Sequence, residues 1–374
     1  MLGAMEIPQA VQPPVRLLMG PGPSNCAPSV LAAMSRPMIG HLDPVFVKLM
    51  EEVKAMLRAV FLTQNAMTFP VSGTGSAGME FCFVNLVEPG DEVVIGVNGV
   101  FGNRMSDVAA RCGATVVKAE SPWGRIIEPA QIAEALKKCR RPKLVAVVHA
   151  ETSTGALTPV EEISKLAHGA GALFLLDTVT SLGGCPVRID DWGVDAVYSG
   201  TQKCLSAPPG LAPVSLSPRA LEVAAKRKTK VQSWYLDVNL LASYWGQERV
   251  YHHTAPISMN YALHEALRLV LIEGLEARWR RHEQNHLALQ AGLAKLGLPL
   301  TAQEGHRLWQ LNAVGVPAGA DEAALRRKLL EQFSIEVGAG LGPLKGKIMR
   351  VGLMGETSRA ENVARFLDAL KQLL

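Results

Sequence analysis

Between residues 66 and 199, short apolar runs alternate with longer segments of helical periodicity. The apolar runs include VVIGVN, LVAVVHAE and ALFLLDTV, and the segments between them include VFGNRMSDVAARCG, AQIAEALKKC and VEEISKLAHGAG. Strands that are apolar along their whole length are typical of parallel sheets that helices cover on both faces. Because βαβ units join such strands, the alternation predicts an α/β fold whose large domain has three layers and a mostly parallel, doubly wound sheet.

The rest of the chain predicts a second, smaller domain. From about Asn260 to Arg281 a long helical pattern, YALHEALRLVLIEGLEARWRR, leads away from the sheet, and helices then alternate with strands. We therefore expect an N-terminal arm over residues 1–19, a large domain over residues 20–276 and a small α+β domain over residues 277–374. A chain of 374 residues is long enough to bury a large core in this arrangement.

Composition and charge argue against several classes of protein. Hydrophobic residues make up 48% of the chain and charged residues 19%, as in globular proteins. The net charge is only +4, and the one basic run, at residues 226–230, is interpreted as a solvated helix end, so we expect no nucleic-acid partner. The apolar runs are too short to span a membrane, and the first residues lack a secretory pattern, so we expect no membrane contact. The six cysteines have no zinc spacing, which predicts reduced thiols, no metal site and a cytoplasmic location.

A glycine-rich turn follows the predicted strand MTFPV and opens the predicted helix SAGMEFCFVNLV. Residues 73–78 match the pattern G-x-G-x-x-G of dinucleotide-binding proteins. That function also needs an acidic residue about 20 positions later, at the end of the next strand. The sequence has Val97-Asn98-Gly99 there. A turn at a helix N-terminus still offers free N–H groups and a positive dipole end, so the motif indicates either a phosphate monoester site or a plain tight turn.

Two charged residues are predicted at the same edge of the sheet as this turn. Asp177 ends the apolar run ALFLL, and Lys203 follows the next strand, AVYS. Either residue alone would be unremarkable, because aspartates often cap helices and loop lysines are usually solvated. Ligands of open α/β sheets bind at the carboxyl ends of the strands, so both side chains are expected to face one ligand. A phosphate turn, an aspartate and a lysine together are the groups that pyridoxal phosphate requires.

Two further features each allow two interpretations. Phe101 follows the strand VVIGVN and either lies against the pyridine ring of that cofactor or is an ordinary core aromatic. His252 and His253 would be a metal pair only if they shared a face, which adjacent residues rarely do, so packing is the better interpretation.

As a set, these motifs resemble those of the class V, fold-type I pyridoxal phosphate aminotransferases, most closely the alanine/serine–glyoxylate (serine–pyruvate) group. The resemblance runs almost from end to end, through GPGPSN, SGTGSAG, ETSTG, DTVTSLGG, YSGTQK, YHHT and RVGL. It implies pyridoxal 5′-phosphate as cofactor, small amino acids and keto acids as substrates, and a homodimer with shared active sites. The implied reaction moves an amino group from alanine or serine to glyoxylate or pyruvate by a ping-pong mechanism.

The resemblance also implies a role for each matching residue. Lys203 would bind the cofactor covalently, and Asp177 would pair with its pyridinium nitrogen. Arg350 would clamp the substrate carboxylate, and Gly22 would line the substrate pocket. The other implied cofactor contacts are Thr74, Gly75, Ser76 and Gln202 at the phosphate, Thr152 at the ring hydroxyl, Val179 and Phe101 at the ring, and Tyr251 and Thr254 at the phosphate from the partner subunit.

Three residues depart from the pattern of that family. Phe101 stands where many relatives have Trp, Ser76 where some have His, and Thr152 where some have Ser. The ring of Phe101 is smaller than the indole of Trp, and the Ser76 hydroxyl cannot supply the charge of an imidazole.

Three other functions share this scaffold or its glycine-rich motif. An (S)-ureidoglycine–glyoxylate aminotransferase of purine catabolism shares the whole scaffold and is the nearest alternative. A cysteine desulfurase is disfavoured, because it would need a nucleophilic cysteine well after the lysine and none follows Cys204. A nicotinamide oxidoreductase built on the glycine-rich turn would be recognised by a bound dinucleotide.

Overall fold

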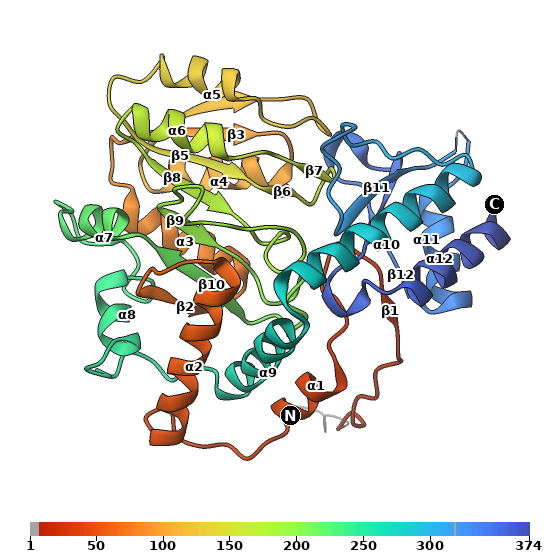
Figure 1. The fold of residues 1–374 in the computed structure, drawn as a ribbon, viewed down its shortest axis with the longest axis horizontal. Helices are drawn as coiled ribbons and strands as arrows, with labels where there is room; N and C mark the ends of the chain where they lie inside the picture. The colour runs from red at the N-terminus through yellow and green to blue at the C-terminus, as the bar shows by residue number, and fades with distance from the viewer. Residues whose placement is uncertain (1–6, 318) are drawn as a thin grey trace, which may run out of the picture.

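The computed structural model describes residues 7–317 and 319–374, so the first six residues of the expected N-terminal arm lie outside the described part. The large domain is built on a seven-stranded sheet with the order β2-β10-β9-β8-β5-β3-β4 (Figure 1). Its strands are β2 (Met67–Ser72), β3 (Glu92–Val97), β4 (Thr115–Glu120), β5 (Pro142–Val148), β8 (Leu173–Asp177), β9 (Ala196–Tyr198) and β10 (Leu211–Leu216). Only the pairs that β10 makes with β2 and β9 are antiparallel. The predicted mostly parallel sheet is confirmed.

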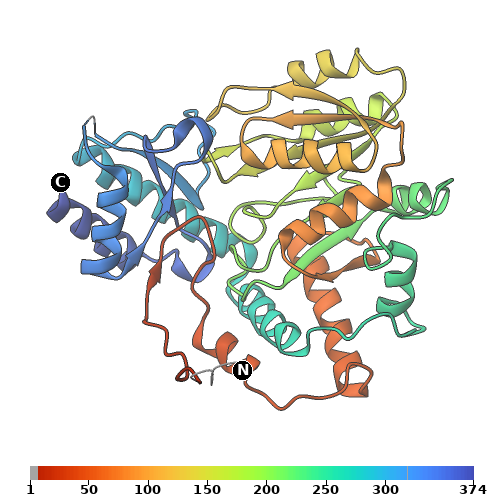
Figure 2. The same cartoon turned by 180° about the vertical axis from the view of Figure 1, so that it is seen from behind.

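The strands of this sheet are apolar throughout because each face packs against its own core. Along β8, Leu173 and Leu175 belong to one core, whereas Phe174 and Leu176 belong to the other. This alternation is the period of two that a strand imposes on its side chains. Helices α3 (Gly75–Leu86), α4 (Val100–Arg111) and α7 (Pro218–Ala225) cover the first face, and α5 (Pro129–Leu136), α6 (Glu161–Gly169) and α9 (Ile257–Glu273) cover the second (Figure 2).

The small domain has a separate core around a three-stranded antiparallel sheet of order β11-β14-β13. The elements that form it are β11 (Leu311–Gly315), β13 (Gly338–Ala339), β14 (Ile348–Gly352), α10 (Leu275–Lys295), α11 (Glu322–Phe333) and α12 (Ala360–Leu373). Helix α10 runs from the large domain to the small one (Figure 1). The proposed domain boundary after residue 276 falls within its first turn.

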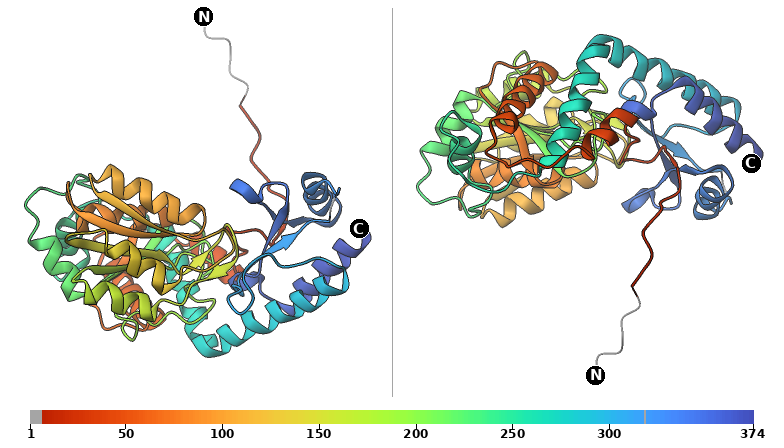
Figure 3. Two further views of the ribbon diagram at one scale, coloured as in Figure 1. Left: turned by 90° about the horizontal axis from the view of Figure 1, so that it is seen from above. Right: turned by 90° about the horizontal axis from the view of Figure 1, so that it is seen from below.

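The segment that leads into the large domain is part of the small domain's surface. Strand β1 (Leu17–Leu18) pairs in parallel with β12 (Ile335–Glu336), and the Gly352 amide donates to the Met19 carbonyl over 2.7 Å. Residues 7–15 extend away from the body of the molecule (Figure 3), with Val15 93% exposed. The segment between residues 17 and 25 thus brings the GPGPSN motif to the junction of the two domains.

Helix α2 (Pro44–Phe61) contributes buried side chains to both cores of the large domain. The remaining elements are short: α1 (Pro28–Met34), α8 (Val238–Trp245), β6 (Ala150–Glu151), β7 (Ala156–Leu157) and the 3-10 turns η1 (Gly342–Leu344) and η2 (Gly355–Thr357). All six cysteines are free thiols. Within the described ranges, no helix combines the length and the apolar composition that crossing a bilayer requires.

Candidate functional site

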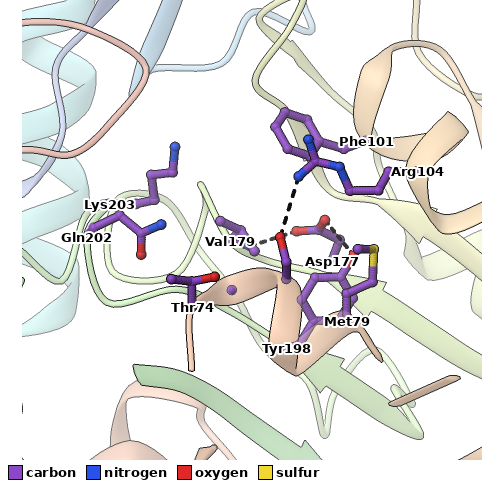
Figure 4. A pocket seen from close by; sticks show the side chains of 11 residues that line it. Thr74, Met79, Phe101, Arg104, Asp177, Val179, Tyr198, Gln202 and Lys203 are labelled. Carbon is purple, nitrogen blue, oxygen red and sulfur yellow. Dashed lines mark hydrogen bonds between the residues drawn. The ribbon is translucent and has the colours of Figure 1, made fainter. Parts of the chain in front are cut away.

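A cavity of about 210 Å³ opens at the carboxyl ends of β8 and β9, where the sheet meets the N-termini of α3 and α4 (Figure 4). This is the edge at which ligands of open α/β sheets bind. Most of the predicted cofactor residues line it, together with three that were not predicted, Met79, Arg104 and Tyr198. The predicted ones are Thr74, Gly75, Ser76, Phe101, Asp177, Val179, Gln202 and Lys203.

Asp177 is the last residue of β8, and its carboxylate is held on both oxygens. Its Oδ2 accepts a hydrogen bond from the Tyr198 hydroxyl over 2.7 Å, and its Oδ1 accepts one from the Val179 amide over 2.8 Å. Burial raises the pKa of Asp177 to about 6, and the hydrogen bond from Tyr198 is the largest opposing influence. At neutral pH the carboxylate is therefore mostly ionised, in a place where its charge is poorly hydrated. Such a group favours a positively charged partner in the cavity.

Lys203 lies in the turn after β9, on the opposite side of the cavity from Asp177 (Figure 4). Its Nζ donates a hydrogen bond to the Pro21 carbonyl of the domain junction. Burial lowers the pKa of Lys203 to about 8, and the positive charge of Arg350 acts in the same direction. An amine with this pKa is partly neutral at physiological pH, so it can serve as a nucleophile and as a proton acceptor.

The backbone at Gly22 makes room for that lysine. Gly22 has φ of +107°, and a Cβ there would lie 2.5 Å from Lys203 Nζ. Any larger residue would be strained and would displace the amine. The sequence prediction placed Gly22 beside the substrate, and the structure places it against the Lys203 side chain.

The glycine-rich turn leaves free amides at the start of α3. Thr74 is the N-cap of that helix and makes no side-chain capping bond. A Cβ at Gly75 would lie 3.3 Å from Val179 Cγ2, so the turn packs closely on the loop that follows β8. Gln202 faces the same turn, and its buried Oε1 has no hydrogen-bond partner among the described residues. Reversing that amide would present its NH₂ group to an anion.

Phe101 stands in the first turn of α4 and faces the cavity. Its amide donates to Glu151 Oε2 over 3.2 Å, and the Arg104 guanidinium lies 4.9 Å from the centre of its ring. Glu151 is fully buried and also accepts from the amide and hydroxyl of Ser153. Burial raises the pKa of Glu151 to about 7. Glu151 is outside the lining of the cavity, and its bonds fix the start of α4.

Arg350 and Thr152 lie outside the cavity, at the junction of the domains. Arg350 extends from β14, its Nε donates to the Ala339 carbonyl over 2.7 Å, and its Nη1 donates to the Thr152 carbonyl over 3.3 Å. Its Nη2 has no hydrogen-bond partner in the part of the chain that the structure describes. The Thr152 hydroxyl is paired with that of Thr180 over 2.6 Å. The structure therefore does not bring Thr152 to the cavity wall, although it joins Thr152 to Arg350.

Tyr251 and Thr254 are exposed and do not line the cavity of their own subunit. Between them, His253 is within 2.7 Å of the Ser72 hydroxyl, at the end of β2. The His252 ring stacks on Trp234 with centres 4.4 Å apart. Within the described residues, no group of three or more His, Cys, Asp or Glu side chains is arranged to hold a metal ion.

Three residues of the site escaped sequence reasoning, although two of them had a detectable signal. Tyr198 is the cross-strand partner of Asp177 at the end of β9, inside a motif that the sequence had already singled out. Arg104 comes three residues after Phe101, and that spacing places both on one face of a helix. Met79 carried no signal, because an apolar residue in a buried helix is unremarkable.

The residues of the cavity fit the cofactor that the sequence predicts. Free helix amides and the unpaired Gln202 amide suit a phosphate group. The buried Asp177 carboxylate suits a protonated ring nitrogen, and the Lys203 amine, with its pKa lowered, suits an aldehyde. The groups that suit the phosphate, the ring nitrogen and the aldehyde come from different elements of the fold, so their meeting at one cavity is not expected by chance.

Comparisons with known proteins agree with this chemistry. The family model described as Aminotransferase class-V matches residues 21–366. The (S)-ureidoglycine–glyoxylate transaminase of Bacillus subtilis is 40% identical over 96% of this chain and 91% of its own length. The alanine–glyoxylate aminotransferase of Mus musculus is 41% identical over 96% of this chain and 88% of its own length. A crystal structure of an alanine–glyoxylate aminotransferase from Nostoc sp. superposes with a TM-score of 0.96 at 51% identity, covering 99% of this chain and 97% of that one.

Proposed function

Because the chain belongs to the class V aminotransferases and is a pyridoxal phosphate-dependent aminotransferase, we propose that it transfers the amino group of alanine or serine to glyoxylate or pyruvate. The observation that carries the proposal is the meeting of Lys203, Asp177 and the turn at residues 74–76 around one cavity. Glyoxylate is favoured as the acceptor, since both relatives named above are glyoxylate aminotransferases.

Sequence identity supports a second amino donor almost as well as alanine. The ureidoglycine–glyoxylate transaminase of Bacillus subtilis and the murine alanine–glyoxylate aminotransferase differ by one percentage point in their identity to this chain. (S)-Ureidoglycine is therefore the alternative donor. The difference between these donors lies in the substituent on Cα, so the side-chain end of the substrate pocket decides between them.

Pyridoxal phosphate, when bound, supplies an aldehyde that captures amines and a ring that withdraws electrons from the bonds of the substrate Cα. The Thr74–Ser76 turn and Gln202 would hold its phosphate, and Asp177 would hold a proton on its ring nitrogen. Tyr198 keeps the Asp177 carboxylate oriented through its hydrogen bond. Phe101 and Val179 form apolar walls of the same cavity.

Lys203 is the residue placed to move protons. Its Nζ has a pKa of about 8, because burial and the Arg350 charge disfavour the ammonium form. In the neutral form, Nζ can accept the proton of a substrate Cα as a general base, and in the ammonium form it can give a proton up again as a general acid. General acid–base catalysis of this kind is worth about 10²–10⁴ in rate.

Arg350 is placed to orient the substrate. Hydrogen bonds to the carbonyls of Ala339 and Thr152 fix its guanidinium, and Nη2 is left to bind a carboxylate. Amino donors and keto acceptors share the α-carboxylate, so one arginine can position both in turn. This is the requirement of a ping-pong reaction in a single pocket.

We propose a homodimer in which Tyr251 and Thr254 complete the partner's phosphate site. Support comes from their exposure and from apolar residues exposed nearby, such as Trp234 at 63% and Val250 at 53%. Mixing inactive Lys203→Ala subunits with inactive Thr254→Ala subunits should regenerate activity, because a heterodimer contains one intact site. No recovery after confirmed subunit exchange would contradict a shared site.

We also propose a cytoplasmic location, which the six free cysteines support. A tagged chain should fractionate with cytoplasmic markers. Enrichment in a membrane or secreted fraction would contradict that location.

A half-reaction screen tests the proposed activity. The purified holoprotein is mixed with alanine, serine or (S)-ureidoglycine, and the visible absorption of the bound cofactor is followed. The true donor should bleach that absorption in a single turnover, and glyoxylate should restore it. A protein that none of the three amines bleaches would contradict the proposed donors.

A further inference from the structure

We propose that Arg104 is a cofactor-binding residue of this site, and that its guanidinium supplies the positive charge that the phosphate group of pyridoxal phosphate meets there. The inference rests on the proposed function and extends it to a residue that the family motifs leave unassigned. Arg104 would also supply the positive charge that Ser76, which stands where some relatives have His, cannot supply.

The guanidinium of Arg104 is directed to the cavity by helix α4. Arg104 lines the cavity (Figure 4). Its Nη1 lies 3.5 Å from the Ser76 hydroxyl at the start of α3. Its Cζ lies 4.9 Å from the centre of the Phe101 ring, one helical turn earlier. The Phe101 face therefore holds the cation in place on the side of the phosphate turn.

The charge of Arg104 is not used in an ion pair within the described residues. Among the side chains lining the cavity, Arg104 and Lys203 are the cations, and Lys203 is required for the aldehyde. Arg104 has no carboxylate at ion-pair distance in the described part of the chain. By contrast Arg111, in the last turn of the same helix, is paired with Asp107 over 2.9 Å.

The field of Arg104 already reaches the groups that line the cavity. Burial raises the pKa of Asp177, and the charge of Arg104 opposes that rise. Burial lowers the pKa of Lys203, and the charge of Arg104 acts in the same direction. A phosphate dianion at the α3 N-terminus would meet two favourable features together, the helix amides and this guanidinium. An arginine that was merely solvated would extend away from both.

The test compares ligands with and without the phosphate group on the cofactor-free protein. Pyridoxal 5′-phosphate and pyridoxal are titrated against the wild type and against Arg104→Met, Arg104→Lys and Arg111→Met, with tryptophan fluorescence quenching as the readout. Arg104→Met keeps an apolar stem over Phe101 and removes the charge, whereas Arg104→Lys keeps the charge. Arg111→Met removes an arginine from the same helix outside the cavity, and thermal unfolding confirms that each variant is folded.

Arg104→Met should weaken the binding of pyridoxal 5′-phosphate by about tenfold or more, as expected for a hydrogen bond to a charged group. Its binding of pyridoxal should stay within about twofold of the wild type, since pyridoxal offers no phosphate. Arg104→Lys should recover most of the loss, and Arg111→Met should bind both ligands as the wild type does. The affinity of the wild type should also fall more steeply with salt than that of Arg104→Met, because screening weakens an exposed ion pair.

Two results would overturn the inference. One is an unchanged affinity of Arg104→Met for pyridoxal 5′-phosphate. The other is an equal loss for both ligands, which would mean that Arg104 acts only by supporting the Phe101 ring. A wild-type protein that binds neither ligand would instead contradict the proposed function itself, so the two failures can be told apart.

Discussion

The cavity edge and the domain junction meet at Lys203, but they are built in different ways. At the cavity edge, Asp177, Lys203 and the turn before α3 follow strand ends of one sheet, and backbone hydrogen bonds fix their places. At the junction, Arg350 depends on the Ala339 carbonyl of the neighbouring strand β13 and on the Thr152 carbonyl of a distant segment. The first region is expected to handle the chemistry common to aminotransferases, and the second to position the substrate. Variants of the two regions should therefore fail in different kinetic parameters.

The largest effect is expected from the residue where the two regions meet. Lys203→Ala should abolish the visible absorption of the bound cofactor and lower turnover by at least about 10²–10⁴, because no other amine lines the cavity among the described residues. Absorption spectra and steady-state rates measure the two effects. Lys226→Ala, at an exposed lysine paired with Glu222, is the control. A variant that kept both absorption and turnover would end the assignment of Lys203.

At the junction, Arg350→Ala should raise the KM for the amino acid and for the keto acid by a similar factor of about 10–100. The reason is that both substrates carry the carboxylate that the guanidinium would bind. The absorption of the bound cofactor should persist, since Arg350 lies outside the cavity wall. Steady-state kinetics with each substrate varied in turn measure the effect.

Two controls sharpen this prediction. Arg365→Ala removes an exposed arginine whose guanidinium, among the described residues, bonds only the Phe333 carbonyl, and KM should not change. Thermal unfolding distinguishes loss of the carboxylate contact from a disturbed fold, because Arg350→Ala also removes the hydrogen bonds to the Ala339 and Thr152 carbonyls. A rise in KM for one substrate alone would argue against a common clamp.

The smallest effect is expected at Tyr198, which lines the cavity beside Asp177. Tyr198→Phe removes the hydrogen bond to Asp177, which at present lowers the pKa of that carboxyl. The pKa of Asp177 should therefore rise, and the acidic limb of the kcat/KM profile should move to higher pH by up to about one unit. A profile of initial rates between pH 5 and pH 9 would record the shift.

A second tyrosine provides the matched control. Tyr261 is also buried, and its hydroxyl donates to the Pro37 carbonyl far from the cavity. Tyr261→Phe should leave the pH profile in place even if it lowers the melting temperature. Equal profiles for both variants would show that the bond between Tyr198 and Asp177 does not tune the reaction.

Much of the cavity edge could be predicted from the sequence because the features that create it are local. An apolar run that ends in an aspartate, a glycine-rich turn before a helix and a lysine after a short strand each leave a pattern within a few residues. The rule that parallel strands end at one edge then brings them together. The bond of Arg350 to Thr152 and the contact of Arg104 with Ser76 could not be predicted in this way, because each joins two different elements of the fold.

The sequence by itself determined the three-layer α/β architecture, the family and the identity of the groups at the cavity edge, because strand periodicity and motif spacing are properties of neighbouring residues. Only the tertiary structure decided that Thr152 turns to Thr180 and that Gly22 packs on Lys203. It also decided which side chains are buried enough for the pKa of Asp177 to rise and that of Lys203 to fall. Desolvation depends on everything that packs around a group, and that environment exists only once distant segments have come together.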